Sequence, residues 1–158
     1  MSLFSLENIT LFIALWGAIL STYKVLSDYM KRTRKLKVEL AYGVGRYQGG
    51  QFGPPIISII ATNIGFREIT LNSMGYLLPD NQQILFLEPQ SSVKFPCSLS
   101  EGKQCVVWQT QRELAKDLKN HGYSGKIKLR GYYKSATGET YKSKSIGFNV
   151  EYALSKNE

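Results

Sequence analysis

Residues Asn8–Tyr23, NITLFIALWGAILSTY, contain no charged side chain. A bilayer-spanning helix needs about 20 apolar residues. Leu3, Phe4 and Leu6 extend the apolar stretch on one side past Glu7, and Val25 and Leu26 extend it on the other if Lys24 snorkels toward the headgroups. The sequence therefore predicts a membrane anchor in this part of the chain.

Two other interpretations of the same stretch stay open, a buried helix of a soluble protein and a cleaved signal peptide. Signal peptides carry basic residues before the apolar run and small residues at the cleavage site. Here Glu7 precedes the run, and bulky residues surround Leu20. Tyr23 and Tyr29 stand where interfacial aromatic residues are expected. These features favour the anchor.

The charges around this stretch are asymmetric. No basic residue precedes it, and the next six basic residues are Lys24, Lys31, Arg32, Arg34, Lys35 and Lys37. Positive flanks are retained in the cytoplasm. We therefore expect a single-pass protein with its N-terminus outside and its C-terminal domain in the cytoplasm. The basic flank of Lys31, Arg32, Arg34 and Lys35 would also contact anionic headgroups, at about 1 kcal/mol per residue.

Small residues recur within the predicted span at helical spacing. Ala14 and Ala18 form one small-xxx-small pair, and Gly17 and Ser21 form another on roughly the same side. Such pairs permit close helix packing. They are also common in membrane helices generally, so self-association through this face is one of two interpretations.

The remaining composition bounds the soluble part. Of the net charge of +8, residues 1–37 contribute +4, and fourteen basic and ten acidic residues contribute the rest. Charge this mild and interspersed does not call for a nucleic-acid partner. We divide the chain into an anchor with its basic helix (1–35), a β-domain (36–154) and a tail (155–158). Cys97 and Cys105 are expected to remain reduced on the cytoplasmic side.

Periodicity changes after the anchor. The helix is expected to run to Lys35, and alternating apolar residues then predict a strand from Leu36 to Tyr42. Glycines and prolines in 43–55 predict a turn-rich connection. Short strands bounded by turn residues are predicted at Ile56–Thr62, Glu68–Leu78, Gln83–Leu87, Ser92–Phe95 and Lys103–Trp108. This pattern indicates a mainly β fold, an antiparallel β-sandwich or barrel.

One short helix and a hairpin complete the pattern. Thr110-Gln111-Arg112-Glu113 has the form of a capping box, and Gly122 stands where a left-handed C-cap belongs. The helix is expected to connect strands across one end of the domain. A hairpin of Gly125–Tyr133 and Thr140–Tyr152 follows. With Thr137-Gly138 as its turn, Ile127 opposes Phe148 and Leu129 opposes Ile146.

The hairpin is rich in basic residues. The candidate contacts to an anionic ligand or to lipid headgroups are Lys126, Lys128, Arg130, Lys142 and Lys144. The predicted register places Lys142 and Lys144 on the face of Ile146, away from the other three, so the charges would not form one patch. A solvated sheet face with positive edges, which discourages edge pairing, is the simpler interpretation.

Residues suited to catalysis or metal binding are sparse. His121 is the single histidine, and Cys97 and Cys105 lie eight apart, which matches no zinc spacing. No base, nucleophile and orienting group can be assembled, which argues against a hydrolase. Gly43-Val44-Gly45 lacks the rest of a dinucleotide fingerprint. We therefore expect no enzymatic activity, no catalytic residue, no metal and no cofactor.

Three segments resemble a known kind of protein: Leu15–Ser21, Thr62–Arg67 and Ala136–Lys144. Together they are similar to uncharacterised small bacterial membrane proteins with one N-terminal transmembrane helix and an immunoglobulin-like β-sandwich. This resemblance implies the bacterial inner membrane and a sandwich with one connector helix. It implies no catalytic residue, cofactor or substrate.

Two functions fit these observations. The first is a membrane-anchored protein-interaction module, acting as an anchor, adaptor or accessory subunit, with a protein partner or further copies of itself. The alternative is a membrane effector, for example in phage defence, whose cytoplasmic β-domain senses an anionic nucleotide. In that case the small-residue helices would associate to perturb the bilayer.

Overall fold

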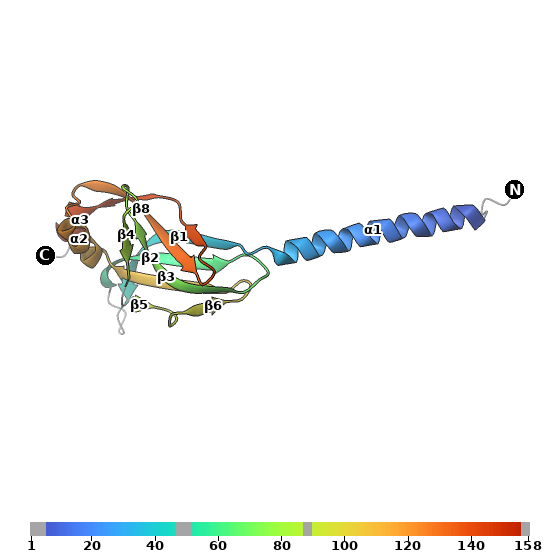
Figure 1. Ribbon diagram of the computed structural model, residues 1–158. Coiled ribbons are helices and arrows are strands. Elements are labelled where there is room, and N and C mark those ends of the chain that lie inside the picture. The colour runs from blue at the N-terminus through green and yellow to red at the C-terminus, as the bar shows by residue number, and fades with distance from the viewer. Residues whose placement is uncertain (1–5, 47–51, 87–89, 156–158) are drawn as a thin grey trace. The chain divides into compact units, whose positions relative to one another are not determined.

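The computed structural model describes residues 6–46, 52–86 and 90–155 (Figure 1). Contacts within the chain divide it into two compact units, Met1–Thr33 and Arg34–Glu158. The first unit holds helix α1 (Leu6–Arg32), and the second holds all the strands and two further helices. The protein is thus mainly β with antiparallel sheets and an N-terminal apolar helix.

Helix α1 is long and apolar enough to cross a membrane. The segment Asn8–Tyr29 of this helix has 22 residues and a mean hydropathy of 1.7, and none of the segment is buried. At 1.5 Å per residue this segment is about 33 Å long, close to the hydrocarbon thickness of a bilayer. The core helix of a soluble protein and a signal sequence can match the same length and composition.

The helix ends at Arg32, so the prediction that it continues to Lys35 was wrong. The Lys35 carbonyl accepts hydrogen bonds from the backbone N–H groups of Ile64 (2.9 Å) and Gly65 (3.1 Å). The Arg34 guanidinium donates to the hydroxyl of Thr137 at 3.4 Å. These contacts tie Arg34 and Lys35 to distant segments of the second unit, directly before the first strand begins at Leu36.

The strands form two antiparallel sheets. One has the order β1-β2-β7-β5, and the other has the order β10-β8-β3-β4, with β6 on β3 and β9 on β8. The strand bounds are β1 Leu36–Arg46, β2 Phe52–Asn63, β3 Ile69–Leu77, β4 Gln83–Leu85, β5 Gln90–Ser91, β6 Cys97–Leu99, β7 Gln104–Thr110, β8 Lys126–Ser135, β9 Thr140–Lys142 and β10 Ile146–Asn149.

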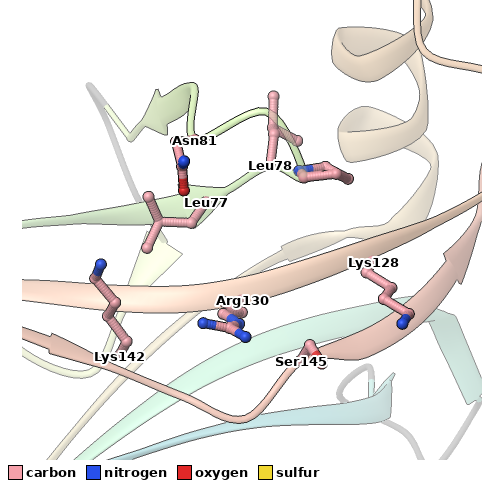
Figure 2. Close-up of a pocket in the computed structure, with 8 residues that line it drawn as sticks. Leu77, Leu78, Asn81, Lys128, Arg130, Lys142 and Ser145 are labelled. Carbon is pink, nitrogen blue, oxygen red and sulfur yellow. The ribbon is translucent and has the colours of Figure 1, made fainter.

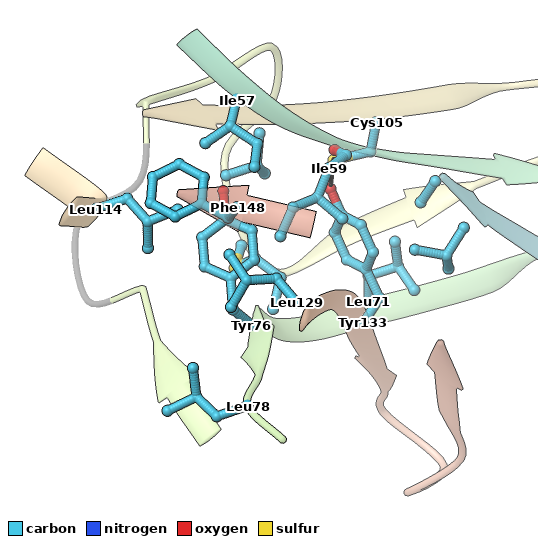
Figure 3. Close-up of a cluster of buried hydrophobic side chains, with 14 of the residues drawn as sticks. Ile57, Ile59, Leu71, Tyr76, Leu78, Cys105, Leu114, Leu129, Tyr133 and Phe148 are labelled. Carbon is cyan, nitrogen blue, oxygen red and sulfur yellow. Dashed lines mark hydrogen bonds between the residues drawn. The ribbon is translucent and has the colours of Figure 1, made fainter. Parts of the chain in front are cut away.

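Both sheets contribute to one hydrophobic core (Figure 3). Ile57 and Ile59 of β2 and Leu129 of β8 are fully buried within it. The Tyr133 hydroxyl of β8 donates to the Ile59 carbonyl of β2 at 2.9 Å and so joins the two sheets. Gly131 permits their close approach, because a Cβ there would lie 2.7 Å from Cγ2 of Ile59.

The predicted connection over 43–55 is largely strand. β1 extends to Arg46 and β2 begins at Phe52, while residues 47–51 lie outside the described part. Pro54 and Pro55 fit in β2 because pairing with β7 starts only at Ile56, so no ladder bond to β7 is required of them. A Cβ on Gly53 would lie 2.9 Å from the Gly45 carbonyl oxygen, which explains a glycine inside this strand pair.

The strand predicted at Ser92–Phe95 was wrong. Instead β5 covers Gln90–Ser91, and β6 covers Cys97–Leu99, beyond the proline expected to end a strand. The predicted strand at Gln83–Leu87 is shorter, since β4 ends at Leu85 and Leu87 lies outside the described residues. These short edge strands form where a long neighbour, β3 or β7, supplies partners.

Helix α2 (Gln111–Asn120) begins as predicted. Thr110 accepts from the Glu113 N–H, and Glu113 accepts from the Thr110 N–H, which is the reciprocal capping box. Gly122 has φ of +84° after the helix end, as the C-cap prediction requires. Leu114, Ala115 and Leu118 are buried against the core.

The final hairpin has the predicted register where β8 pairs with β10, a register shifted by one residue where β8 pairs with β9, and a different ending. Leu129 pairs with Ile146, and Ile127 pairs with Phe148, as expected. The predicted second strand ends at Asn149, however, and helix α3 (Val150–Ser155) follows. The Asn149 side chain accepts from the Tyr152 N–H at 3.1 Å, an N-cap bond that favours a helix over a continued strand.

Candidate functional site at the open sheet edges

Strands β1 and β10 are the end strands of their sheets. β1 pairs with β2, and β10 pairs with β8. The outer edge of such a strand presents N–H and C=O groups that have no ladder partner. An open groove of about 730 Å³ runs beside these edges, lined by Leu36, Lys37, Val38, Glu39, Leu40, Ile64, Lys142, Lys144, Ser145 and Ile146.

The groove has an apolar floor and a charged rim. Val38 is buried, and Leu36, Leu40 and Ile146 are half-buried against the core. At the rim, Lys37 and Glu39 form an ion pair at 2.8 Å. The ammonium groups of Lys142 and Lys144 have no ion pair among the described residues, so the rim is net positive.

A tyrosine joins the two edges. The Tyr42 hydroxyl of β1 donates to the Gly147 carbonyl of β10 at 2.7 Å. Burial raises the pKa of Tyr42, which keeps this hydroxyl protonated and available as a donor. The bond fixes the spacing of β1 and β10 beyond the groove lining.

A one-residue bulge separates β9 from β10. Lys142 pairs with Tyr132, and Ile146 pairs with Leu129, so three residues on one strand face two on the other. Ser143 compensates for the interrupted ladder. Its hydroxyl accepts from the Gly131 N–H at 2.9 Å, and its own N–H donates to the Gly131 carbonyl at 2.8 Å.

The bulge changes which face Lys142 occupies. Cross-strand partners share a face, so pairing with Tyr132 places Lys142 with Lys128 and Arg130. The sequence-based register assumed the turn Thr137-Gly138 with no bulge and therefore placed Lys142 on the opposite face, which was wrong. The loop instead holds three residues, closed by the Ser135 N–H bond to the Glu139 carbonyl at 2.9 Å.

Three basic side chains consequently line one pocket on the outer face of β8. This basic pocket has a volume of about 310 Å³ and is lined by Leu77, Leu78, Pro79, Asn81, Lys128, Arg130, Lys142 and Ser145. Figure 2 shows Arg130 and Ser145 on one side, with Leu77, Leu78 and Asn81 on the other. The side chains of Lys128, Arg130 and Lys142 have no ion pair or hydrogen bond within the described residues, and no carboxylate lines the pocket.

The loop after β3 forms one wall of the basic pocket. Asn81 adopts the left-handed conformation, with φ of 65°. The neighbouring Asp80 accepts a short hydrogen bond from the Tyr123 hydroxyl and another from the Gln82 N–H at 3.1 Å. These bonds lower the pKa of Asp80 and raise that of Tyr123. Asp80 therefore acts as a support for the loop.

The other predicted contacts lie elsewhere. Lys126 pairs with Asn149 and lies against Gly147, outside the groove and the basic pocket. Lys144 lines the groove and not the basic pocket. Lys142 and Ser145 line both cavities, so the bulged segment forms the ridge between them. The basic candidates thus divide between two neighbouring cavities. The groove itself was missed, although the predicted edge strand with its alternating Leu36, Val38 and Leu40 was a signal for it.

The predicted helix-packing residues Ala14, Gly17, Ala18 and Ser21 lie in α1 with exposed side chains. A Cβ on Gly17 would meet nothing within 4 Å, so this face is open in the single chain. Lys31 and Arg32 lie in the last turn of α1, and their side chains lie outside the described part. Arg34 and Lys35 belong to the second unit, where the Arg34 side chain contacts Thr137.

The residues considered for metal binding or catalysis have local roles. His121 Nδ1 lies 2.7 Å from the Asp117 carbonyl at the end of α2. Cys97 and Cys105 are buried free thiols, and Sγ of Cys105 lies 3.9 Å from the Tyr133 hydroxyl. Among the described residues, no group of three or more His, Cys, Asp or Glu side chains could hold a metal ion.

Comparison with known proteins gives little further guidance. No protein-family model matches the sequence. No curated protein matches it. A crystal structure of the putative ApaA protein from Bordetella pertussis aligns with 11% identity and a TM-score of 0.41, covering 73% of this chain and 94% of that one. An X-ray structure of a structural genomics target aligns with 11% identity and a TM-score of 0.35, covering 76% and 89%. Similarities this low carry no argument about fold or function.

Proposed function

We propose that this protein is a membrane-anchored interaction module whose β-domain binds an extended segment of a partner protein in the groove beside β1 and β10. The observation that carries this proposal is two open strand edges beside one apolar groove with a basic rim. An added strand would pair with an edge through backbone hydrogen bonds and place alternate side chains in the groove, as in β-strand addition.

The groove suggests the chemistry of the bound segment. The lining includes five consecutive residues of β1, Leu36–Leu40, a length of about 17 Å in a strand. Apolar side chains facing Leu36, Leu40 and Ile146 would complete the half-buried floor. Acidic side chains at the alternating positions of the bound segment, on its other face, would meet Lys142 and Lys144. The expected partner segment therefore alternates apolar and acidic residues.

Helix α1 supports the membrane part of the proposal. The apolar side chains of Asn8–Tyr29 are exposed, and 0% of this segment is buried within the described part of the chain. A helix that is apolar on all sides and uncovered is stable in lipid. The basic flank favours a cytoplasmic β-domain in a bacterial inner membrane. Fusions of alkaline phosphatase and of green fluorescent protein to the C-terminus test this orientation.

The finer fold assignment is part of the same proposal. Two antiparallel sheets with a shared core support an immunoglobulin-like sandwich with α2 as connector. They are also compatible with the family of small bacterial membrane proteins that the sequence resembles. In this proposal the domain is an anchor, adaptor or accessory subunit, and catalysis belongs to its partner.

Site-specific crosslinking tests the groove. A photo-crosslinking residue at Lys144, which lines only the groove, should capture a protein partner from the membrane. The same residue at Lys119 on α2 is the matched control and should not. Lys144→Glu should weaken co-purification of that partner, whereas Lys128→Glu should leave it unchanged. A monodisperse monomer without a stoichiometric partner would count against the proposal.

The basic pocket supports a second candidate function, sensing of an anionic nucleotide. Lys128, Arg130 and Lys142 line the pocket, no carboxylate is among its described lining residues, and a phosphate group would neutralise these cations. Cyclic nucleotides should then raise the melting temperature of the full chain. Arg130→Glu should abolish that shift, and Lys126→Glu, outside the pocket, should retain it. Unchanged melting with every nucleotide would exclude this function.

A further inference from the structure

We infer that the loop Asn63–Arg67, with the adjoining Arg34 and Lys35, is a lipid-docking patch that holds the β-domain against an anionic membrane surface. This inference rests on the proposed membrane anchoring. The patch is defined by the exposed side chains of Ile64 and Phe66 and the basic side chains of Arg34, Lys35 and Arg67.

The loop is rigidly built although its apolar side chains face outward. Asn63 is fully buried, and its amide nitrogen donates to the carbonyls of Arg67 (2.7 Å) and Leu99 (2.8 Å). Its amide oxygen accepts from the Gly65 N–H at 2.9 Å. Ile64 and Phe66 nevertheless remain 58% and 55% exposed. A framework this well bonded fixes two apolar side chains on the surface.

The same loop is bonded to the segment that leaves the anchor. The N–H groups of Ile64 and Gly65 both donate to the Lys35 carbonyl. Only Thr33 and Arg34 separate Lys35 from the last residue of α1. Because an extended residue spans at most about 3.6 Å, covalent connectivity alone keeps the Cα of Lys35 within about 11 Å of the Cα of Arg32, the last residue of α1.

Charge favours an anionic lipid surface as the occupant. Arg34, Lys35 and Arg67 belong to the patch. A fourth basic residue, Lys103, is adjacent to it, because the Lys103 carbonyl accepts a hydrogen bond from the Asn63 N–H. Three carboxylates lie at the same end: Glu68, which accepts from Ser100, Glu101, and Glu139 in the turn whose Thr137 Arg34 contacts. Basic residues therefore exceed acidic ones. An aromatic and an aliphatic side chain beside basic groups is the pattern of an interfacial membrane contact.

The opposite end of the β-domain provides an internal control. Helix α2 contacts the start of β2, where the Gln111 side chain donates to the Ile56 carbonyl at 3.2 Å. The patch follows the other end of β2, seven residues later at Asn63, which corresponds to about 23 Å of strand. Figure 1 shows α2 and the start of β1 at opposite ends of the domain. A probe on α2 should therefore stay in water.

Spin labelling of the full chain tests the inference. Cysteine variants Ile13→Cys, Phe66→Cys and Asn120→Cys would be labelled with a nitroxide in vesicles of phosphatidylglycerol and phosphatidylcholine in equal parts. Cys97 and Cys105 are buried, so the unsubstituted chain serves as the labelling control. Relaxation by oxygen, which partitions into lipid, is compared with relaxation by an aqueous nickel complex. The oxygen-to-nickel ratio should be higher at 66 than at 120, and Arg67→Glu should lower it at 66 alone.

Each outcome separates this inference from the proposed function. Equal ratios at 66 and 120, with a lipid-exposed label at 13, would overturn the docking patch and leave the anchor intact. A label at 66 shielded from both reagents would mean that protein covers the patch, which also overturns the inference. A water-exposed label at 13 would overturn the anchor and, with it, the patch.

Discussion

Helix α1 and the β8–β10 hairpin use apolar residues in opposite ways. In α1, Phe12 and Leu11 are 73% and 71% exposed. In the hairpin, Leu129 and Phe148 lie in the core, and the basic side chains of β8 point outward. A chain in water has no reason to expose a continuous apolar helix. The same residue types therefore indicate two different surroundings for the two regions.

The two regions also differ in how strongly one additional residue changes the position of the side chains that follow it. In α1 a residue more or less changes the helix by 1.5 Å and leaves its apolar character intact. In the hairpin one extra residue between Lys142 and Ile146 moves Lys142 to the other face of the sheet. Functional inference from a strand thus depends on register, whereas inference from a membrane helix depends mainly on composition.

The largest expected effect comes from truncating matched leucines in the two regions. Leu129→Ala removes a fully buried side chain and should lower the free energy of unfolding of the β-domain by about 2–5 kcal/mol. Leu15→Ala in α1, at a position 58% exposed, should leave the unfolding of that domain unchanged. Denaturant unfolding of both variants in detergent checks this. Equal losses would mean that α1 packs on the domain.

A charge in the middle of α1 tests its expected lipid surroundings. Ile13→Arg should cost about 3 kcal/mol of insertion free energy and reduce the fraction of protein in the membrane pellet. Ile13→Ala is the matched control and should remain in the pellet. Carbonate extraction measures the distribution. If the arginine variant stayed as firmly bound as the control, a spanning α1 would be excluded.

Removing the hydroxyl that supports the bulge should have a smaller effect. Ser143→Ala leaves the buried Gly131 N–H without its side-chain acceptor, which should cost about 1–3 kcal/mol. Ser145→Ala, at an exposed position of the same segment, should change stability by less than about 0.5 kcal/mol. Thermal melting of the two variants makes the comparison. Equal melting temperatures would show that the bulge does not depend on Ser143.

The smallest effect is expected from acid titration beside the basic pocket. The Tyr123 hydrogen bond lowers the pKa of Asp80 below its usual 3.8. The unfolded chain therefore binds this proton first, so the stabilisation is present above pH 3.8 and is lost as pH falls through the lowered value. Tyr123→Phe should show a smaller loss of melting temperature between about pH 5 and pH 3 than the unsubstituted chain. A larger loss would contradict this assignment.

Much of the fold was predictable because local rules acted alone. The capping box at Thr110 and the left-handed Gly122 depend on nearby residues, and both were predicted correctly. The pairing of Leu129 with Ile146 followed from matching apolar faces. The short strands β5 and β6 were not predicted, because a strand of two or three residues exists only through the neighbour that pairs with it.

The candidate site, like the fold, has features that follow from the sequence and features that depend on tertiary contacts. The sequence alone determined that Lys128 and Arg130 are outward-facing cations on a hairpin and that Asn8–Tyr23 is an uncharged apolar stretch, because charge and periodicity are local properties. Only the tertiary structure decided that Lys142 shares their face, that all three cations line one pocket and that the edges of β1 and β10 flank one groove. A single bulge and the meeting of two sheet edges set those distances. The bulge depends on bonds between Ser143 and Gly131, twelve residues apart, whereas the two edges meet through a contact between residues more than a hundred apart, that of Tyr42 with Gly147.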